Sequence, residues 1–523
     1  MKGGPSPYRQ HRELAERIES EFRVSEWRAG DVDLWPILSQ DLFLDIFRIA
    51  AADTAPQPPS FARRAATSLA TPALNLWKSR HDRAHWVARP HRADAIFLGD
   101  GVSLDRIDGS WRDRFAEPII SGYERQRRRC FVMQSGNLTR LPWARPSYAA
   151  NQIVARAAAA AILAKRPGLE LSDHAEVTRL LQQYGVKAPS LTRDRIERRA
   201  RIVAAQAAEF DRVLEQVRPS VAFAVTYYAG LGHAFALACR RRGILCVDLQ
   251  HCPHDGVHRA YRWSALPSRG YSTLPGLFWT WSEADAANIE RWAGKLLRPW
   301  HRAIAGGHTQ IVGMDAPELE RLWPSARGEG ASFEREILVA LQPIGGKGET
   351  WKALADQVAA SPPSWRWWIR RHPASTSAQD EDCAPLLSLN LPNVIVGAAA
   401  QRPLPVLLAH MDALVSLASG AAGEAEMFGV PAFFLDQEAF HTFPRLIARG
   451  SASVTSVRSL TAAIHRLPKP DSRDRIEGPS IEVTLQEIDR IAADYSRICS
   501  ETAGDEVDRG ERVIRECEAP CAA

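Results

Sequence analysis

The stretch from residue 411 to residue 435 constrains the fold of this chain most strongly. It runs from an apolar segment at 411–417 through Ser419-Gly420 into a short helical pattern, and then into a second apolar segment at 430–435. Two short apolar runs separated by one turn and one helix are typical of parallel strands joined by a crossover. The pattern therefore predicts a βαβ unit and an α/β fold.

The same alternation recurs elsewhere, and the length of the chain requires more than one core. Strand, helix and strand are predicted at 221–225, 230–242 and 244–249. A chain of 523 residues exceeds what one core usually serves, so two large domains are expected. We expect two Rossmann-like domains that face a cleft, at 1–300 with a helical N-terminal extension and at 310–470, with a linker over 295–312 and a C-terminal helix and tail at 471–523 that can pack back on the first domain.

A cationic turn closes one strand of the second half. The apolar, aromatic run at 365–369 is followed by Arg370, Arg371, His372 and Pro373. Open parallel sheets bind ligands at the carboxyl ends of their strands, and guanidinium groups suit phosphate. The alternative is a solvated turn after a core strand. We expect Arg371 and His372 to bind a phosphate, and we count His372 among the catalytic candidates.

The turn of the 411–435 unit is a second candidate phosphate site. Ser416 and Ser419-Gly420 precede the short helix, so the first N–H groups and the helix dipole would face a ligand. Glu424 lies in the first turns, where its carboxylate could accept a ribose hydroxyl. The alternative is an ordinary capped helix, since the dipole favours early acidic residues in any case.

A glycine-rich loop follows the first predicted strand of the second half. Gly345 and Gly346 would let the backbone approach a phosphate, and Lys347 could pair with it. The spacing differs from that of a P-loop, and a flexible turn is the alternative.

The densest polar cluster of the first half follows the predicted strand at 244–249. It contains His251, Cys252, His254, Asp255 and His258. Imidazole can accept a proton near neutral pH, so His251 is our first candidate for a general base. The spacing is not that of a zinc site, and we expect no metal. A strand-end loop whose histidines bind backbone groups is the alternative.

Several of these motifs together resemble a known family. A strand ending in His372-Pro373, the pattern Asp412-x-Leu-x-Ser-x-x-Ser-Gly420 and a following Phe-Gly-x-Pro431 resemble the donor domain of GT-B glycosyltransferases. The similarity is to the cytidine-donor branch: bacterial sialyltransferases, Kdo transferases and teichoic-acid glycerophosphotransferases. Residues 249–253 are similar to the His-Gly-x-Pro motif of the last group, with Cys252 in place of glycine.

The resemblance implies a glycosyltransferase of surface polysaccharide biosynthesis. It would move a sugar, Kdo or sialic-acid-like, from a CMP-linked donor to a hydroxyl of a polysaccharide or lipid-linked glycan, with no cofactor beyond the CMP- or CDP-linked donor. A CDP-glycerol-type glycerophosphotransferase, a sugar-nucleotide epimerase and a non-catalytic assembly protein are alternatives. His251 matches the motif histidine, whereas Asp255-Gly256 and Asp100-Gly101 resemble the Asp-Gly motif of sialyltransferases, so the base remains open among the three residues.

Composition narrows the partners. The formal net charge of +5 is too small to indicate nucleic-acid binding, and it suits anionic small molecules or a membrane surface. The eight cysteines show no zinc-type pairs, and neither a leader segment nor a membrane span is evident. We therefore expect a cytoplasmic protein with peripheral association at the inner membrane. The sequence does not indicate an oligomeric state.

Overall fold

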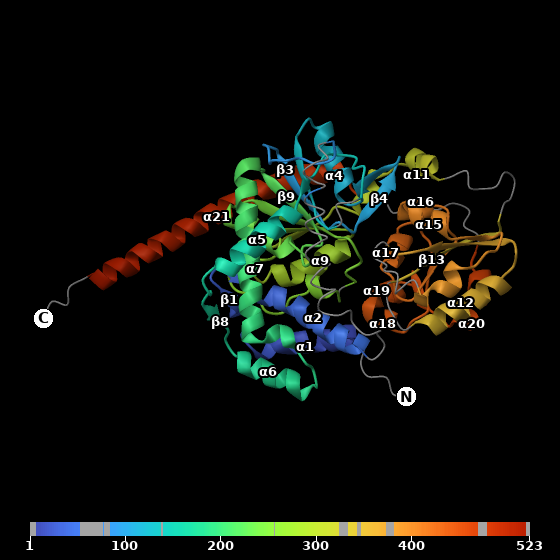
Figure 1. Cartoon of the computed structure of the whole chain (residues 1–523), viewed down its shortest axis with the longest axis horizontal. Helices are drawn as coiled ribbons and strands as arrows, with labels where there is room; N and C mark the ends of the chain where they lie inside the picture. Colours follow the sequence, from blue (N-terminus) through green and yellow to red (C-terminus); the bar gives the residue numbers. More distant parts are fainter. Residues whose placement is uncertain are drawn as a thin grey trace.

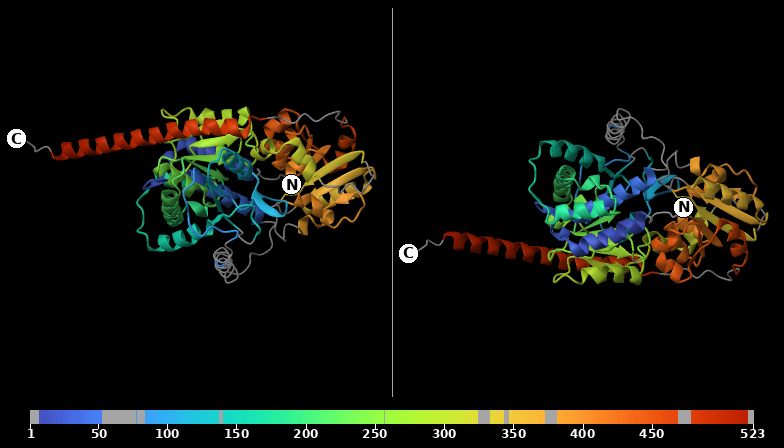
Figure 2. Two further views of the ribbon diagram at one scale, coloured as in Figure 1. Left: turned by 90° about the horizontal axis from the view of Figure 1, so that it is seen from above. Right: turned by 90° about the horizontal axis from the view of Figure 1, so that it is seen from below.

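Two parallel β-sheets lie side by side in the protein, and helices cover both faces of each (Figures 1 and 2). The computed structural model describes residues 7–52, 77, 84–136, 140–255, 257–323, 333–342, 347–372, 381–468 and 478–518. A cleft separates the carboxyl ends of the two sheets. The predicted α/β fold, with two Rossmann-like domains facing a cleft and a helical N-terminal extension, is confirmed.

The sheet of the first domain has seven strands, all parallel. Its central strands are apolar and buried along their whole length, as expected for a sheet covered on both faces. β12 pairs with β11, so the first sheet extends beyond the expected boundary at residue 300 into the segment predicted as a linker. In spatial order the strands are β12 (Arg302–Ala305), β11 (Leu277–Thr280), β10 (Leu245–Leu249), β9 (Val221–Val225), β3 (Ala95–Gly99), β6 (Cys130–Gln134) and β7 (Tyr148–Ala149).

Alternate residues of each strand point to opposite faces of the sheet, and helices cover both faces, so the domain has two cores. One core joins Ile96, Ala222 and Cys246 to the N-terminal helices and to α7 and α8, and the other joins Phe97, Phe223 and the C-terminal helix. A hairpin, β4 (Leu104–Ile107) and β5 (Ser110–Asp113), and a small sheet of β1 (Arg28–Ala29), β2 (Val32–Asp33) and β8 (Leu169–Glu170) complete the domain. The helices are α1 (Pro7–Glu21), α2 (Trp35–Ala52), α4 (Ala116–Arg125), α5 (Asn151–Leu163), α6 (His174–Gln183), α7 (Arg193–Val217), α8 (Gly232–Arg241), α9 (Glu283–Ala293) and α10 (Thr309–Gly313).

The sheet of the second domain has six parallel strands. They lie in the order β15 (Val394–Ile395), β14 (Trp365–Arg370), β13 (Arg335–Ala340), β16 (Ala413–Ser416), β17 (Ala432–Phe434) and β18 (Ala452–Val454). The surrounding helices are α11 (Ala316–Leu322), α12 (Gly348–Ala360), α14 (Ala384–Leu387), α15 (Gly397–Gln401), α16 (Leu404–Leu408), α17 (Ala421–Glu426), α18 (Ala439–Thr442), α19 (Pro444–Ala448) and α20 (Val457–His465).

A buried ion pair explains how β14 carries a charged residue between its tryptophans. Arg366 lies directly opposite Glu336 of β13, and its guanidinium is 2.5 Å from the Glu336 carboxylate. The Trp368 indole N–H donates to the same carboxylate at 2.8 Å. Both charges are therefore satisfied in the interior, where an unpaired charge would be costly.

The C-terminal helix α21 (Ile481–Glu518) begins against the first domain and then extends away from it (Figures 1 and 2). Ile481, Leu485 and Tyr495 join the core under the first sheet. Two ion pairs tie the helix to α4 and the loop that follows it, Arg125 with Glu482 at 2.5 Å and Arg128 with Asp489 at 2.6 Å. The chain thus crosses back from the second domain to the first.

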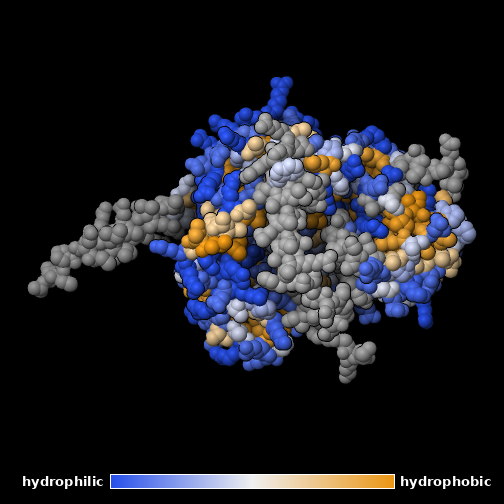
Figure 3. Space-filling model, in the orientation of Figure 1, coloured by the Kyte–Doolittle hydropathy of each residue, from blue (hydrophilic) through white to orange (hydrophobic). Residues whose placement is uncertain are grey.

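Apolar side chains gather over α5 on the face shown in Figure 3. Val154, Ile162 and Leu163 of this helix are exposed. Among the described helices, none combines the length and the apolar character needed to cross a membrane.

Candidate functional site

A cleft of about 450 Å³ lies between the carboxyl ends of the two sheets. Asp100 and His251, which follow β3 and β10, line it from the first domain, and Arg370, Arg371 and His372 line it from the end of β14. Ligands of parallel sheets bind at this edge, and the volume lies within the range of ligand pockets. The structure therefore brings the cationic turn and the histidine motif to one cavity, although they are more than a hundred residues apart.

Two guanidinium groups line the cleft, that of Arg370 buried and that of Arg114 half-buried. Arg370 ends β14, and its guanidinium donates to the carbonyl oxygens of Ala399, at 2.7 Å, and Arg402. Burial lowers the pKa of Arg370 to about 10, and the charge of Arg114 acts in the same direction. Arg114 comes from the first domain, and its Nε has no hydrogen-bond partner among the described residues. The charges of Asp105 and Glu424 act on the pKa of both arginines in the opposite direction, and an anion bound between the two guanidinium groups would add to that stabilisation.

The motif histidine His372 adds a neutral imidazole to the cationic wall. Burial lowers the pKa of His372 to about 4, and the charges of Arg114 and Arg370 contribute. The ring is therefore neutral at pH 7, and it can donate one N–H to a ligand. Arg371, the next cation along the chain, also lines the cleft and is exposed.

Asp100 lines the cleft, but its carboxylate is engaged by the protein. It accepts hydrogen bonds from the N–H groups of Val102 and Ser103, both at 2.8 Å, and from the hydroxyl groups of Ser103, at 2.8 Å, and Thr226, at 3.2 Å. These four bonds occupy the acceptor positions of the carboxylate. Asp100 thus holds the turn after β3, and in this arrangement it has little capacity to act as a base.

A second carboxyl group, Asp113, lies behind the wall of the cleft. Burial, followed by the charge of Asp100, raises the pKa of Asp113 to about 7. Its Oδ1 accepts the N–H groups of Phe115, at 3.1 Å, and Ala116, at 3.0 Å, so it caps the start of α4. A carboxyl group with a raised pKa therefore lies directly behind this wall of the cleft.

The imidazole of His251 lines the cleft from the first domain. Burial lowers the pKa of His251 to about 4, and the charges of Arg259 and Arg114 contribute to the shift. Nε2 lies 3.0 Å from the Tyr228 hydroxyl, and Nδ1 has no partner among the described residues. The Tyr228 hydroxyl also interacts with the Cys252 thiol. When Tyr228 donates to Cys252, Nε2 of His251 donates to Tyr228 and the Nδ1 lone pair is available to accept a proton.

The turn before α17 meets the first domain at close range. Ser419 Oγ accepts the N–H of Ala421 at 3.3 Å, and Ser416 Oγ accepts the N–H of Ser419 at 3.2 Å. Ser416 is buried beneath this turn, whereas Ser419 and Gly420 line the cleft. A Cβ atom at Gly423 would lie 2.4 Å from Pro253 Cγ in the loop after β10. The glycine at 423 is therefore required by the contact between the domains.

Glu424 lines the cleft and is joined to the segment that connects the two domains. Its Oε1 lies 3.2 Å from Nε2 of His308. Nδ1 of His308 accepts the N–H of Ile311 at 3.3 Å, which places the ring proton on Nε2, opposite the carboxylate. Glu424 can still face a ligand, and its position depends on this buried pair.

Three groups of predicted site residues fall elsewhere. Asp255 lies outside the cleft, where its carboxylate accepts the N–H of Arg445 at 2.7 Å across the domain boundary. Lys347 does not line the cleft, because its ammonium pairs with Asp436 at 2.7 Å. Asp255 and Lys347 therefore do not line the cleft in this structure, and their predicted roles stay predictions. Gly345 and Gly346 lie outside the described residues.

Sequence reasoning missed several residues of the cleft. Arg370 is adjacent to the predicted pair and could have been found from the same motif. Arg114 and Thr226 line the cleft, and Tyr228 and His308 support His251 and Glu424 from behind it. All four stand in no recognisable motif, and only packing brings them to the site. Among the described residues there is no group of three or more His, Cys, Asp or Glu side chains that could hold a metal ion.

Comparisons with known proteins give fold similarity only. No protein-family model matches the chain, and no curated protein matches it. Similar solved structures include UDP-GlcNAc 2-epimerase from Methanocaldococcus jannaschii, with 12% identity, a TM-score of 0.44 and coverage of 75% of this chain and 98% of that chain. S. aureus MnaA with UDP has 11% identity, a TM-score of 0.46 and coverage of 76% and 96%. The calicheamicin glycosyltransferase CalG4 has 15% identity, a TM-score of 0.37 and coverage of 80% and 98%.

At these identities and TM-scores the similarities do not assign an activity to this chain. Three of the similar structures contain UDP or UDP-GlcNAc. None of the three proteins named above is described as a cytidine-donor enzyme, and the comparisons give that expected relation no support.

Proposed function

We propose that this protein is an enzyme that binds a nucleotide-activated sugar in the cleft and transfers the sugar to an acceptor hydroxyl. The observation that carries the proposal is the pair of cleft-lining guanidinium groups, Arg114 and Arg370, beside the neutral imidazoles of His251 and His372. The guanidinium groups suit the phosphates of the donor, and the imidazoles suit proton transfer and hydrogen bonding.

The chemical step follows from this arrangement. The acceptor oxygen attacks the anomeric carbon, the bond from that carbon to the phosphate oxygen breaks, and its electron pair leaves with the phosphate. Arg114 and Arg370 stabilise the charge that develops there. The proton of the acceptor hydroxyl passes to Nδ1 of His251, whose Nε2 is held by Tyr228.

Donor binding would also prepare the base. The charge of Arg114 is one of the causes that lower the pKa of His251. A phosphate bound at Arg114 offsets that charge, and so the pKa of His251 rises toward neutrality when the donor is present. The imidazole then becomes a stronger proton acceptor only in the loaded enzyme.

Epimerisation of the nucleotide sugar is a second candidate, and one observation favours it. Asp113, with a pKa raised by burial to about 7, interacts with Asp100 in the cleft wall. A carboxyl group that exchanges a proton near neutral pH can serve acid–base chemistry on a single substrate. Such a reaction needs the nucleotide sugar alone.

Turnover assays separate the two reactions. We expect release of nucleotide only when donor and acceptor glycan are both present, and a loss of about 10²–10⁴-fold in rate for His251→Ala. Asp255→Asn is the matched control, because Asp255 lies outside the cleft. Formation of an epimer from donor alone would favour the second candidate, and undiminished activity of His251→Ala would remove His251 from the mechanism.

The nucleotide base is tested separately. The motif resemblance at His372 and Ser419 favours cytidine, so CMP or CDP should stabilise the protein more than UDP or GDP. A ligand at about 100 times its Kd adds about 2.7 kcal/mol to the free energy of unfolding, which a thermal-shift panel detects. Stronger stabilisation by UDP or GDP would overturn the cytidine preference and leave the proposed transfer reaction in place.

A further inference from the structure

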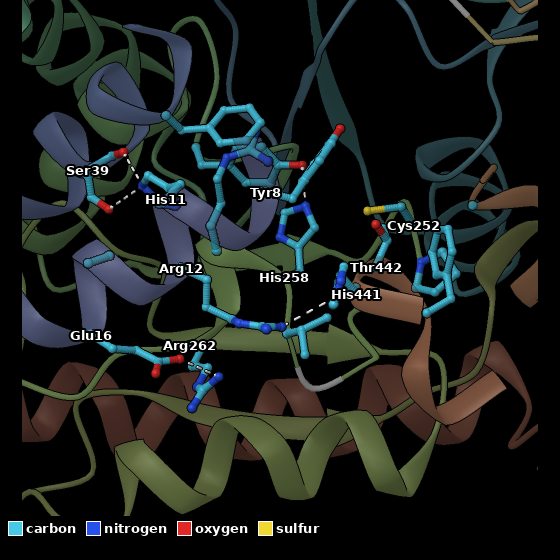
Figure 4. Close-up of a pocket in the computed structure, with 18 of the residues that line it drawn as sticks. Tyr8, His11, Arg12, Glu16, Ser39, Cys252, His258, Arg262, His441 and Thr442 are labelled. Atoms are coloured by element: carbon cyan, nitrogen blue, oxygen red, sulfur yellow. Dashed lines mark hydrogen bonds and ion pairs between the residues drawn. The ribbon is translucent and has the colours of Figure 1, made fainter. Parts of the chain in front are cut away.

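A second cavity of about 280 Å³ adjoins the cleft, and Cys252 and Gly420 line both. Figure 4 shows its side chains coming from α1, from the loop after β10 and from α18 of the second domain. Cys252 follows His251 directly, so a molecule in this cavity lies next to the candidate base. The volume is close to the lower end of the range for ligand pockets, and it suits a group of about one sugar residue.

The charges that line this cavity are not balanced. Arg262 is neutralised by Glu16 at 2.7 Å. Glu19 is buried and accepts the Trp35 indole N–H at 2.9 Å, and burial raises the pKa of Glu19 to about 7. Of the two carboxyl groups of the lining, that of Glu16 is therefore paired and that of Glu19 carries only part of a full negative charge near pH 7. Arg12 contacts only the carbonyl oxygen of His441 among the described partners, at 3.5 Å.

Arg259, like Arg12, has no carboxylate partner among the described residues. Its guanidinium lies 3.8 Å from the centroid of the Phe43 ring, and its Nε donates to Gln40 Oε1 at 2.7 Å. No ion pair joins it to a carboxylate in the described part of the chain. Gln40 is buried, and its Nε2 has no hydrogen-bond partner among the described residues. The guanidinium of Arg259 thus presents donors at the wall of the cavity, where an anionic acceptor group would satisfy them.

The imidazoles of the cavity do not add positive charge. Burial lowers the pKa of His11 to about 3, and the charge of Arg259 acts in the same direction. Burial, followed by the charge of Arg259, also lowers the pKa of His258. Selectivity for an anion therefore depends on the arginines, and chiefly on Arg259.

Aromatic rings complete the lining. Tyr8 and Phe43, from the two N-terminal helices, pack with ring centroids 5.2 Å apart, and Tyr228 joins them from the first domain. Aromatic faces pack well against the apolar face of a sugar ring. His441 and Thr442 of α18 close the cavity from the second domain, as Figure 4 shows.

We propose that this second cavity binds the acceptor, and that the acceptor is an anionic saccharide whose carboxylate or phosphate is held by Arg259. The inference rests on the proposed transfer reaction and adds the substrate class to it. The aromatic rings of Tyr8 and Phe43 hold the sugar ring, and the acceptor hydroxyl enters the cleft past Cys252 toward His251.

Binding to the full-length protein tests the proposal with three probes: methyl β-glucuronide, glucose 6-phosphate and uncharged methyl β-glucoside. By saturation-transfer NMR and calorimetry we expect one or both charged probes to bind and the uncharged probe not to bind. A preference between the charged probes identifies the source as carboxylate or phosphate. Equal binding of the uncharged probe, or no binding of any probe, would overturn the proposal.

Variants locate the site. Arg259→Gln should weaken binding of the charged probe about 10- to 100-fold, and Arg259→Lys should retain part of it. Arg179→Gln, which removes an exposed arginine of α6, is the control and should bind as the unaltered protein does. If Arg259→Gln binds the charged probe as tightly as the unaltered protein does, the inference is wrong. If that variant does not fold, the comparison of charged and uncharged probes with the unaltered protein still tests the inference.

Nucleotide binding distinguishes the two proposals. Arg259 does not line the nucleotide cleft, so Arg259→Gln should bind nucleotide with unchanged affinity. If nucleotide binds and charged saccharides do not, this inference fails while the nucleotide site stands. If nucleotide does not bind either, the proposed function fails first.

Discussion

Removing the charge of Arg114 tests the phosphate site most directly. Arg114 comes from the loop after β5, faces the cleft with Arg370 and has an unpartnered Nε among the described residues. No strand or helix contact depends on a hydrogen bond from its guanidinium in the described structure. Arg114→Gln should therefore fold normally and lose affinity for a phosphate ligand.

The expected loss follows from the strength of one charge-assisted contact. A hydrogen bond to a charged group contributes about 1.5–3 kcal/mol, which corresponds to a Kd about 10- to 150-fold weaker. Because the group is half-buried, salt screens the interaction less than it would at the surface. The same substitution should raise the pKa of His251 and of His372, since the charge of Arg114 lowers both.

Calorimetric titration with the nucleotide selected by the thermal-shift panel measures the first effect, and histidine NMR titration measures the second. Arg112→Gln is the matched control, because Arg112 lies on the same hairpin, 3.9 Å from the Glu117 carboxylate, and does not line the cleft. Equal nucleotide affinity for Arg114→Gln and the unaltered protein would refute the assignment of the phosphate to this pair of arginines.

Three further substitutions test the architecture around the site. Arg366→Leu leaves the facing carboxylate of β13 buried without its partner, so chemical denaturation should show a free energy of unfolding lower by about 3–5 kcal/mol. Lys352→Ala, which removes an exposed ion pair of α12, is the control and should leave the free energy of unfolding unchanged. Gly423→Ala places a Cβ atom 2.4 Å from a proline of the facing loop, so nucleotide affinity should fall and the free energy of unfolding should drop by about 1–3 kcal/mol. Gly397→Ala, with open space around its Cβ, is the control, and equal nucleotide affinities of the two variants would contradict this interpretation. Burial raises the pKa of Asp113 from 3.8 to about 7, so between these pH values the folded protein binds a proton that the unfolded chain does not, and its stability falls as pH rises. Asp113→Asn lacks this proton, so its stability relative to the unaltered protein should rise by up to about 1.4 kcal/mol per pH unit between pH 4 and 7. A difference that stays constant with pH would show that the carboxyl is not perturbed.

The strands and the motif turns could be predicted because neighbouring residues specify them. The apolar run that forms β14 and the unit of β16, α17 and β17 follow the expected order, and His372 and Ser419 lie at the expected strand and turn ends. A strand buried on both faces needs a continuous apolar run, and a turn into a helix needs a small polar cap, so both leave local signals in the sequence.

The same local reasoning misplaced residues whose partners are distant. Lys347 follows a glycine-rich loop, as a phosphate ligand might be expected to do, but Asp436, almost ninety residues later, neutralises it. Asp255 is close to His251 in sequence, but its own backbone adopts a left-handed conformation that turns the chain away from the cleft. Its carboxylate therefore accepts the backbone N–H of Arg445 instead of facing the cleft. Spacing along the chain does not report the side on which a loop residue faces.

The sequence by itself determined the α/β class, the two domains and the placement of the histidine and serine motifs at the ends of strands, because hydrophobic periodicity and turn chemistry are properties of adjacent residues. Only the tertiary structure decided that Arg114 and Arg370 share one cleft, that Tyr228 holds His251, and that the N-terminal helices wall a second cavity around Arg259. These groups come from segments that meet only when the domains pack, and their pKa values and charge balance depend on burial and on neighbours distant in the chain.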